Sequence, residues 1–303
     1  MNSDTQFIPK ELKTFLHSNF GTVARIEPLS GVAGEGGANR LTFEDGRSVI
    51  VKSSPLPRER SFYEHHAGHV KRAGVGVPQL YWSGADDSGN NWIVLEDVLH
   101  PFPKERWVCD AEQIEMLFRL HSSTWGSERP KLDTAAYRPS WNEEMTHQAC
   151  EWFSDKEERS QVERGLIEVQ LHARFLFQPL CCLSADPNPT NWRVRRNGEL
   201  VLTDRERFCY GHPSIDLAIT MPGLGRKNGT TEAKIAALYR TCWERNRGSV
   251  PTELGDLERW MQVAKIWSAV EFIASATLNP ALYPEGTILY IVRELPGFLE
   301  QFV

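Results

Sequence analysis

The segment from residue 183 to residue 204 constrains this chain most, because it spaces two aspartates and an asparagine around a predicted hairpin. Asp186 is followed five positions later by Asn191, and Asp204 closes the segment. The residues between Asn191 and Asp204 read as strand, turn and strand, in the runs 191–195, 196–198 and 199–203. Such a hairpin would return Asp204 to the neighbourhood of Asn191.

The residue types of this segment suit phosphoryl transfer. Moving a γ-phosphoryl group requires a carboxylate that orients the acceptor hydroxyl and takes its proton, and oxygen ligands for the magnesium that neutralises the developing charge. We expect Asp186 to be the catalytic base, and Asn191 and Asp204 to bind the metal. An Asp-Pro-Asn-Pro turn followed by a strand-end aspartate explains the same residues, and this simpler interpretation is preferred for the segment in isolation.

A second feature upstream favours the enzymatic interpretation. Residues 29–40 are rich in glycine and lie between two predicted strands, the second of which ends in Lys52. Gly34, Gly36 and Gly37 would let the backbone approach phosphates closely, and Lys52 could reach their oxygens. Neither a Gly-Lys-Ser/Thr ending nor a complete dinucleotide fingerprint is present, so a glycine-rich hairpin over a nucleotide fits best. A plain flexible turn explains the glycines equally well.

The run 58–70 is predicted to be a helix that supplies a partner for Lys52. A glutamate on it could hold the lysine amine toward the α- and β-phosphates. Glu59 is the preferred candidate and Glu64 the reserve, although most glutamates on helices are simply solvated. Two histidines on one face of this helix could bind a metal, but no nearby partner completes a site: His65 and His69.

The order of these motifs resembles that of the aminoglycoside phosphotransferase and choline kinase family. The matching segments extend from about residue 22 to the C-terminal helices. They are the glycine-rich loop, Lys52, residues 59–63, the strand 92–95 with Glu96 and Asp97, residues 120–125, residues 186–191, Asp204 and residues 211–218. Several motifs in the right order are far more specific than any one of them.

The resemblance implies a protein-kinase-like fold of two lobes, with ATP in the cleft and a small-molecule hydroxyl as acceptor. By position, Glu96 to Val98 would be the hinge whose backbone meets adenine, with Asp97 starting the crossing into the second lobe. Asp216 matches the family's structural carboxylate, which supports the catalytic loop. His121 matches a helix histidine that belongs to the core.

Two positions depart from the family pattern. Ser184 and Ala185 precede the catalytic aspartate where the family has His-Gly, so the histidine that normally supports the loop is absent. Ser184 could supply a smaller hydrogen bond. The metal-ligand motif reads Asp-Arg-Glu at 204–206, where Glu206 matches the acidic position of a family variant and could assist a second metal.

The predicted fold class is α+β. An N-terminal nucleotide-binding lobe over residues 1–99 would combine an antiparallel sheet with a helix, and a mainly helical lobe over residues 100–303 would hold the catalytic loop and the acceptor site. Pro101 and Pro103 mark the boundary. Strands are expected at 23–26, 40–43, 48–52, 79–82 and 91–98, and helices at 59–73, 111–125, 141–154 and 157–177.

Composition excludes several other classes of protein. A formal charge of -6 argues against nucleic-acid binding, and the longest apolar stretch, 263–278, is interrupted by charged residues, which argues against a membrane span. The six cysteines form no Cys-x-x-Cys pair and the N-terminus resembles no secretory signal. We therefore expect a cytoplasmic protein with reduced cysteines. The family resemblance implies ATP as the phosphoryl donor, and the residue types of the segment 183–204 point to Mg²⁺ as the metal.

The acceptor is expected to be a small-molecule alcohol, which could be cationic. Trp260, Trp267 and Glu271 share one helix face and could hold an amine, although packing in the core is the preferred explanation of the tryptophans. An acidic cluster at 143–144, near Trp141 and Glu151 in sequence, is an equally weak candidate. Two further functions remain open: a nucleotide-binding pseudokinase that regulates a partner, suggested by the missing histidine, and a kinase-like nucleotidyl transferase.

Overall fold

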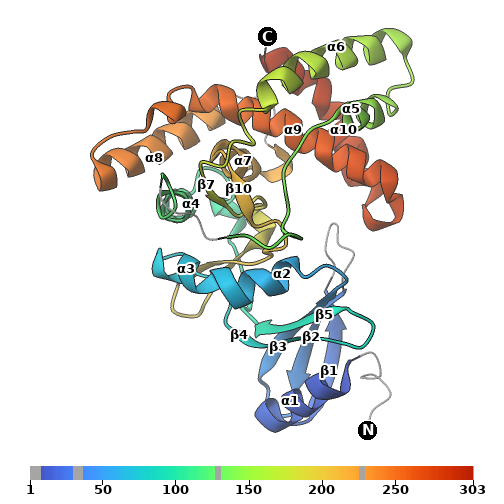
Figure 1. Ribbon diagram of the computed structural model, residues 1–303, viewed down its shortest axis with the longest axis vertical. Helices are drawn as coiled ribbons and strands as arrows, with labels where there is room; N and C mark the ends of the chain where they lie inside the picture. The colour runs from blue at the N-terminus through green and yellow to red at the C-terminus, as the bar shows by residue number, and fades with distance from the viewer. Residues whose placement is uncertain (1–7, 30–36, 127–130, 225–228, 303) are drawn as a thin grey trace.

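The computed structural model describes residues 8–29, 37–126, 131–224 and 229–302. An N-terminal lobe built on one sheet lies below a mainly helical C-terminal lobe (Figure 1). The sheet is antiparallel in the order β1-β2-β3-β5-β4, with bounds Val23–Pro28, Gly37–Phe43, Ser48–Ser54, Asn91–Glu96 and Leu80–Ala85. The predicted α+β class is confirmed.

Each face of this sheet is covered by helix. Helix α1 (Lys10–Phe20) places Leu12 and Leu16 against Val49 and Val51 on one face. The other face carries a continuous helical segment made of α2 (Arg58–Ser61), the π-helix η2 (Phe62–His66) and α3 (Ala67–Arg72). Because strand side chains alternate, Lys52 points to the face opposite Val49 and Val51, toward this second helical segment.

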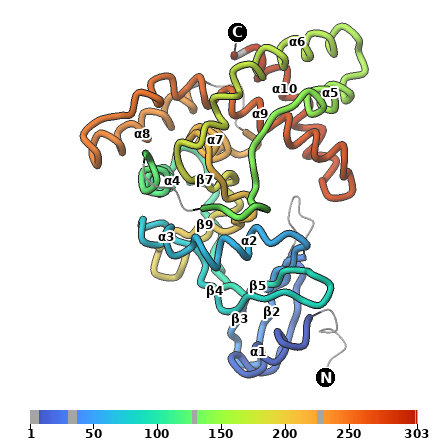
Figure 2. Tube along the Cα trace, in the orientation of Figure 1, coloured from blue at the N-terminus to red at the C-terminus, as the bar shows by residue number. Residues whose placement is uncertain are grey.

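The C-terminal lobe is assembled around one apolar helix. Helix α9 (Leu257–Leu278) is buried along much of its length, as expected of a helix that is apolar on all sides. The other helices of this lobe are α4 (Ala111–Ser122), α5 (Glu143–Cys150), α6 (Lys156–Ala173), α7 (Ser214–Ile219), α8 (Gly229–Arg247) and α10 (Glu285–Phe302). The trace in Figure 2 shows α1 at one end of the molecule and α6 and α10 at the other.

Two small sheets in the C-terminal lobe hold the predicted catalytic segment. Strands β8 (Trp192–Val194) and β9 (Leu200–Leu202) form the expected hairpin, and β6 (His100–Pro101) pairs with β8. Strand β7 (Cys181–Leu183) pairs with β10 (Cys209–Gly211). The segment 183–204 thus begins at the end of β7 and ends two residues beyond β9.

The lobes meet where a turn of the N-terminal lobe packs against the hairpin. Gly76 accepts a hydrogen bond from the backbone N–H of Leu202 at 3.0 Å, and a Cβ atom at position 76 would stand 2.2 Å from the carbonyl oxygen of Leu200. Only glycine permits this approach. Nearby, Arg195 forms a bidentate ion pair with Glu96 at 2.6 and 2.7 Å. The predicted boundary between an N-terminal lobe ending at residue 99 and a C-terminal lobe beginning at residue 100 stays a prediction.

The expected strand and helix bounds, the expected lack of a membrane span and the state of the cysteines can each be compared with the structure. The expected strands are present, each within a few residues of its predicted bounds, and the helix expected at 59–73 contains the π-helical stretch η2. Within the part of the chain that the structure describes, no helix is long and apolar enough to cross a membrane. All six cysteines are free thiols.

Candidate functional site

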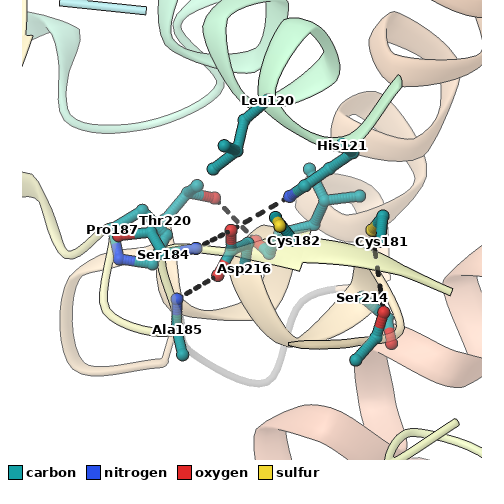
Figure 3. A network of polar contacts seen from close by, with 12 residues as sticks. Leu120, His121, Cys181, Cys182, Ser184, Ala185, Pro187, Ser214, Asp216 and Thr220 are labelled. Carbon is teal, nitrogen blue, oxygen red and sulfur yellow. Dashed lines mark hydrogen bonds and ion pairs between the residues drawn. The ribbon is translucent and has the colours of Figure 1, made fainter. Parts of the chain in front are cut away.

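Asp216 binds the loop that leads to Asp186 through Ser184 and Ala185 (Figure 3). The Asp216 carboxylate, on α7, accepts hydrogen bonds from the backbone N–H of Ser184 at 2.9 Å and of Ala185 at 2.7 Å. It also contacts Nε2 of His121 on α4 at 3.0 Å. These side chains are fully buried. The structural positions implied for Asp216 and His121 by the family resemblance are thus occupied as expected.

The smaller hydrogen bond that Ser184 could supply is not formed. Its hydroxyl oxygen is buried and has no hydrogen-bond partner among the described residues. The loop is held through its backbone instead, and Ala185 adopts a positive φ of 59°, a conformation that costs a non-glycine residue energy and persists only when the surroundings enforce it. The two N–H donors bound to Asp216 provide that enforcement.

Asn191 connects the loop to the hairpin. It ends the short 3₁₀ helix η4 (Pro189–Asn191), and its amide Nδ2 donates to the backbone oxygen and to the carboxylate Oδ2 of Asp186, both at 3.0 Å. The backbone carbonyl oxygen of Asn191 accepts hydrogen bonds from the N–H and the hydroxyl of Thr203, the residue before Asp204. Burial raises the pKa of Asp186 to about 6, with Arg207 acting in the opposite direction.

Lys52 joins the two lobes through two carboxylates. Its Nζ lies 2.5 Å from Oε2 of Glu59 and 3.2 Å from Oδ1 of Asp204. Burial lowers the pKa of the Lys52 ammonium, but the charges of Asp204 and Glu59 outweigh this effect and hold the pKa above its ordinary value. The expected Lys52–Glu59 pair is present. Glu64, the reserve candidate, pairs with Arg60 instead.

The oxygens left over at this site fit magnesium. Asn191 uses only its amide nitrogen and Asp204 only Oδ1 in contacts with the protein, so Oδ1 of Asn191 and Oδ2 of Asp204 have no protein partner among the described residues. Magnesium favours such hard oxygen donors and takes its remaining ligands from phosphates and water. Within the described part of the chain, no group of three or more His, Cys, Asp or Glu side chains is placed to hold a metal ion without further ligands.

Glu206 is a further carboxylate whose charge interacts with that of Asp204. Burial and, after it, the charge of Asp204 raise the pKa of Glu206 to about 7. Its suggested contribution to a second metal stays a prediction. Arg205, between the two acids, is fully buried with its guanidinium 5.2 Å from the ring centroid of Phe62, and its backbone N–H donates to Glu59.

Gly37, Glu96 and Val98, three of the expected glycine and hinge positions, lie in or directly after strands of the N-terminal sheet. Gly34 and Gly36 fall outside the described residues, whereas Gly37 begins β2 one residue before the partner of Lys52 in the sheet. Glu96 uses its side chain to bind Arg195, and Val98 is buried with an exposed fraction of 6%. Contact of their backbone with adenine remains a prediction. Asp97 is held by Arg40 and Ser48.

The tryptophans proposed for the acceptor site belong to the core. Trp267 is fully buried and donates to the carbonyl of Ser140, and Trp260 stacks on Phe175 with ring centroids 4.2 Å apart. Packing, the preferred explanation, is confirmed. The Glu271 carboxylate is also occupied, because it forms an ion pair with Arg207. The sequence patterns gave no indication of this partner.

The remaining polar candidates are occupied by local contacts. Glu144 accepts from Gln148 on the same helix, and Trp141 donates to Thr146. His69 contacts the hydroxyl of Ser123. None of these contacts brings a side chain toward Asp186, so the acidic cluster at 143–144 gains no support as an acceptor site.

Two residues near Asp186 were missed by the sequence analysis. Tyr137 lies in the irregular segment between α4 and α5, and Arg207 lies three residues after Asp204. Arg207 donates to the Tyr137 hydroxyl at 2.6 Å, and both side chains bind Glu271. Tyr137 carries no periodic signal, whereas the position of Arg207 directly after the Asp-Arg-Glu motif could have drawn attention.

Comparison with known proteins identifies the fold. No protein-family model and no curated protein sequence matches the chain. Among solved structures, a thermostable mutant of aminoglycoside phosphotransferase APH(4)-Ia is similar with a TM-score of 0.62 and 13% identity, covering 95% of this chain and 98% of that protein. The amicoumacin kinase hAmiN has a TM-score of 0.57 and 13% identity, with coverages of 99% and 96%.

Further similar structures agree. A candidate fructosamine-3-kinase from Haemophilus somnus has a TM-score of 0.55 and 11% identity, and the match covers 96% of both chains. Another APH(4)-Ia structure is a ternary complex with AMP-PNP and hygromycin B. The resemblance inferred from the motifs is therefore confirmed in the fold: this chain has the bilobal protein-kinase-like fold of the aminoglycoside phosphotransferases.

Proposed function

We propose that this protein is an ATP- and Mg²⁺-dependent kinase that transfers the γ-phosphoryl group to a hydroxyl of a small molecule. One observation carries the proposal. Lys52, Glu59 and Asp204 form a connected ion cluster, and Asn191 links that cluster through the hairpin to Asp186. These side chains come from both lobes and from positions up to 152 residues apart.

Each residue has a definite task in this proposal. Lys52, kept protonated by its two carboxylate partners, binds phosphate oxygens of ATP, and Glu59 holds its amine in place. Asn191 and Asp204 would hold Mg²⁺, which supplies charge neutralisation on the phosphates when bound. Asp186 accepts a hydrogen bond from the acceptor hydroxyl and takes its proton.

The similar structures support the nucleotide part of the proposal. One APH(4)-Ia structure contains AMP-PNP with hygromycin B, and the amicoumacin kinase contains AMP-PNP with Ca²⁺ and its substrate. At 13% identity these neighbours support a nucleotide and a small-molecule acceptor, but they name no acceptor for this chain.

A pseudokinase is the second candidate, and the residues before Asp186 favour it. Ser184 and Ala185 replace the histidine and glycine of the family. Binding of the loop to Asp216 weakens this argument, because two backbone hydrogen bonds hold the loop without a histidine. The two candidates differ in turnover: both bind ATP, but only the kinase forms ADP together with a phosphorylated product.

The test is a screen for ADP release with amines, sugars and antibiotics as acceptors, in the presence of ATP and Mg²⁺. Mass spectrometry of the product distinguishes a phosphate adduct from an adenylate adduct, which would indicate nucleotidyl transfer. Replacing Asp186→Asn should lower kcat by about 10²- to 10⁴-fold, the usual contribution of a general base. ATP should still raise the melting temperature of this variant.

An exposed carboxylate provides the matched control. Asp45 lies in a turn and pairs only with Arg47, so Asp45→Asn should leave turnover unchanged. Full phosphotransfer by the Asp186→Asn variant would contradict the role of Asp186, and ATP binding without turnover for every acceptor would favour the pseudokinase.

A further inference from the structure

A polar cluster beside Asp186 has no role in the proposed transfer. It consists of Arg58 on α2, Tyr137, Arg207 and Glu271 on α9. Arg207 follows Asp204 by three residues, the neighbouring Thr203 is hydrogen-bonded to Asn191, and Asn191 donates to Asp186, so the cluster lies beside Asp186. In agreement, the charges of Arg207 and Glu271 act on the carboxyl group of Asp186.

The centre of the cluster is the Tyr137 ring. The guanidinium carbon of Arg207 lies 4.5 Å from the ring centroid and that of Arg58 lies 5.9 Å from it. Two arginines therefore face one aromatic ring, while Glu271 is the single carboxylate of the cluster. Arg207 also interacts electrostatically with the carboxyl group of Asp186, so the two arginines face two acidic groups.

The carboxylate of this cluster is not available to a cationic acceptor. Glu271 receives hydrogen bonds from the Tyr137 hydroxyl and from Nη2 of Arg207, and its side chain is 16% exposed. Trp260 and Trp267, the aromatic side chains that could complete a cage for an ammonium group, pack in the core. A bound amine would have to displace Arg207 from its own ion pair.

The donors of Arg207, in contrast, are only partly used. Both of its hydrogen bonds leave from Nη2, so Nη1 has no partner among the described residues, and Nε is buried without a partner. The side chain remains 28% exposed. A guanidinium has five N–H donors and no acceptor, and it binds carboxylate, carbonyl or hydroxyl oxygens.

We propose that Arg207 is a specificity-determining residue that selects acceptors carrying an oxygen function, a hydroxyl or a carboxylate, beside the reacting hydroxyl, and discriminates against an ammonium group at that place. The inference rests on the proposed function and names its substrate class. It replaces the expectation of a cationic acceptor with that of a neutral or acidic polyhydroxylated compound.

The first test compares acceptors that differ in one substituent. One set is D-glucosamine, D-glucose and D-glucuronate, and a second is ethanolamine, ethylene glycol and glycolate. With ATP and Mg²⁺, the best oxygen-bearing member of a reactive set should have a kcat/KM about tenfold or more above that of the amine, a typical discrimination for one polar group. An amine that reacts as well as the others overturns the inference.

The second test changes the charges of the cluster. Arg207→Gln removes the cation paired with Glu271 and leaves the carboxylate with the Tyr137 hydroxyl as its partner, so the preference should move toward the amines by about tenfold. Because a carboxylate without its cation could destabilise the fold, the double variant Arg207→Gln with Glu271→Gln removes both charges and should lose the discrimination without acquiring the reverse preference. An unchanged order of substrates in both variants overturns the inference.

The matched control is another ion pair of the C-terminal lobe. Arg240 on α8 pairs with Glu258 on α9 at 2.7 Å, and the arginine has nearly the same side-chain exposure as Arg207, 27% against 28%. Arg240→Gln should leave the order of acceptors unchanged. ATP-dependent stabilisation should be equal in all variants, because none of the changed residues contacts Lys52.

Failure of the proposed function gives a different result from failure of the inference. If no compound releases ADP, phosphoryl transfer is refuted, and binding decides the question of specificity. In the presence of AMP-PNP and Mg²⁺, oxygen-bearing members should raise the melting temperature more than the amines do. Equal or reversed stabilisation overturns the inference irrespective of turnover.

Discussion

The loop under Asp186 and the ion cluster around Lys52 lie next to each other, yet they are stabilised in different ways. Asp216 and His121 are fully buried, and His121 contacts the Tyr239 hydroxyl at 2.9 Å with its other nitrogen. In the ion cluster, by contrast, the side chains of Lys52 and Asp204 are 24% and 35% exposed.

This difference separates a supporting carboxylate from a ligand-binding one. Both oxygens of Asp216 are used by backbone N–H groups, so it has little capacity left for a ligand. Asp204 uses one oxygen for Lys52 and keeps the other, and its side chain is partly exposed. A buried carboxylate that is saturated by neutral donors maintains the shape of a loop, and one with a spare oxygen can bind a cation.

The largest expected effect is that of replacing Asp216 with asparagine. The amide would direct an NH₂ group at one of two backbone N–H donors, leaving a buried donor without a partner. We expect a loss of about 3 kcal/mol in the free energy of unfolding, measured by urea denaturation. The control is Asp256→Asn, since Asp256 makes no side-chain cap hydrogen bond to α9. A loss similar to the control would remove the distinction between the two regions.

Next in size is the effect of Glu59→Gln on nucleotide binding. Without the ion pair, Lys52 is held by Asp204 alone, and the KM for ATP should rise about tenfold, equivalent to ~1.4 kcal/mol. Glu64→Gln is the matched control, because Glu64 lies on the same helical segment and pairs with Arg60. Equal KM values for the two variants would show that the Lys52–Glu59 contact does not organise the phosphates.

The pH dependence should also distinguish the two regions. A general base acts in its ionised form, and burial raises the pKa of Asp186 to about 6, so kcat/KM should be constant above this value and fall about tenfold per pH unit below it. Glu206, whose pKa is raised to about 7 by burial, could contribute a second acidic limb. The limb that persists in Glu206→Gln belongs to Asp186, and a rate that stays constant down to pH 5 would contradict its assignment as base.

The smallest expected effect is that of Ser184→Ala. The Ser184 hydroxyl is buried without a partner, so its removal should change the free energy of unfolding by less than ~1 kcal/mol, in the stabilising direction. The turnover of the variant should stay within about twofold of the unchanged protein. The loop is held by the contacts of Asp216 with its backbone, and the Ser184 side chain takes no part in them. A clear loss of stability or turnover would show that Ser184 replaces the missing histidine after all.

Much of the candidate site could be predicted because its parts are local. The hairpin between Asn191 and Asp204 follows from alternation and a turn, and the pairing of Lys52 with Glu59 follows from a strand and a helix that are adjacent in sequence. The acceptor side could not be predicted in this way. Tyr137 and Glu271 are 134 residues apart, and neither lies in a pattern that indicates a partner.

The sequence by itself determined the α+β class, the order of the motifs and the residue types of the proposed metal site, because strand and helix periodicity and turn chemistry act over a few residues. Only the tertiary structure decided that Asp216 holds the loop through two backbone N–H groups and that Arg207 forms an ion pair with Glu271. The tertiary structure also decided that Trp267 is buried and that Trp260 packs on Phe175. Such choices depend on which distant groups are buried together, since each buried donor and charge must find its partner among whatever side chains the packing brings near.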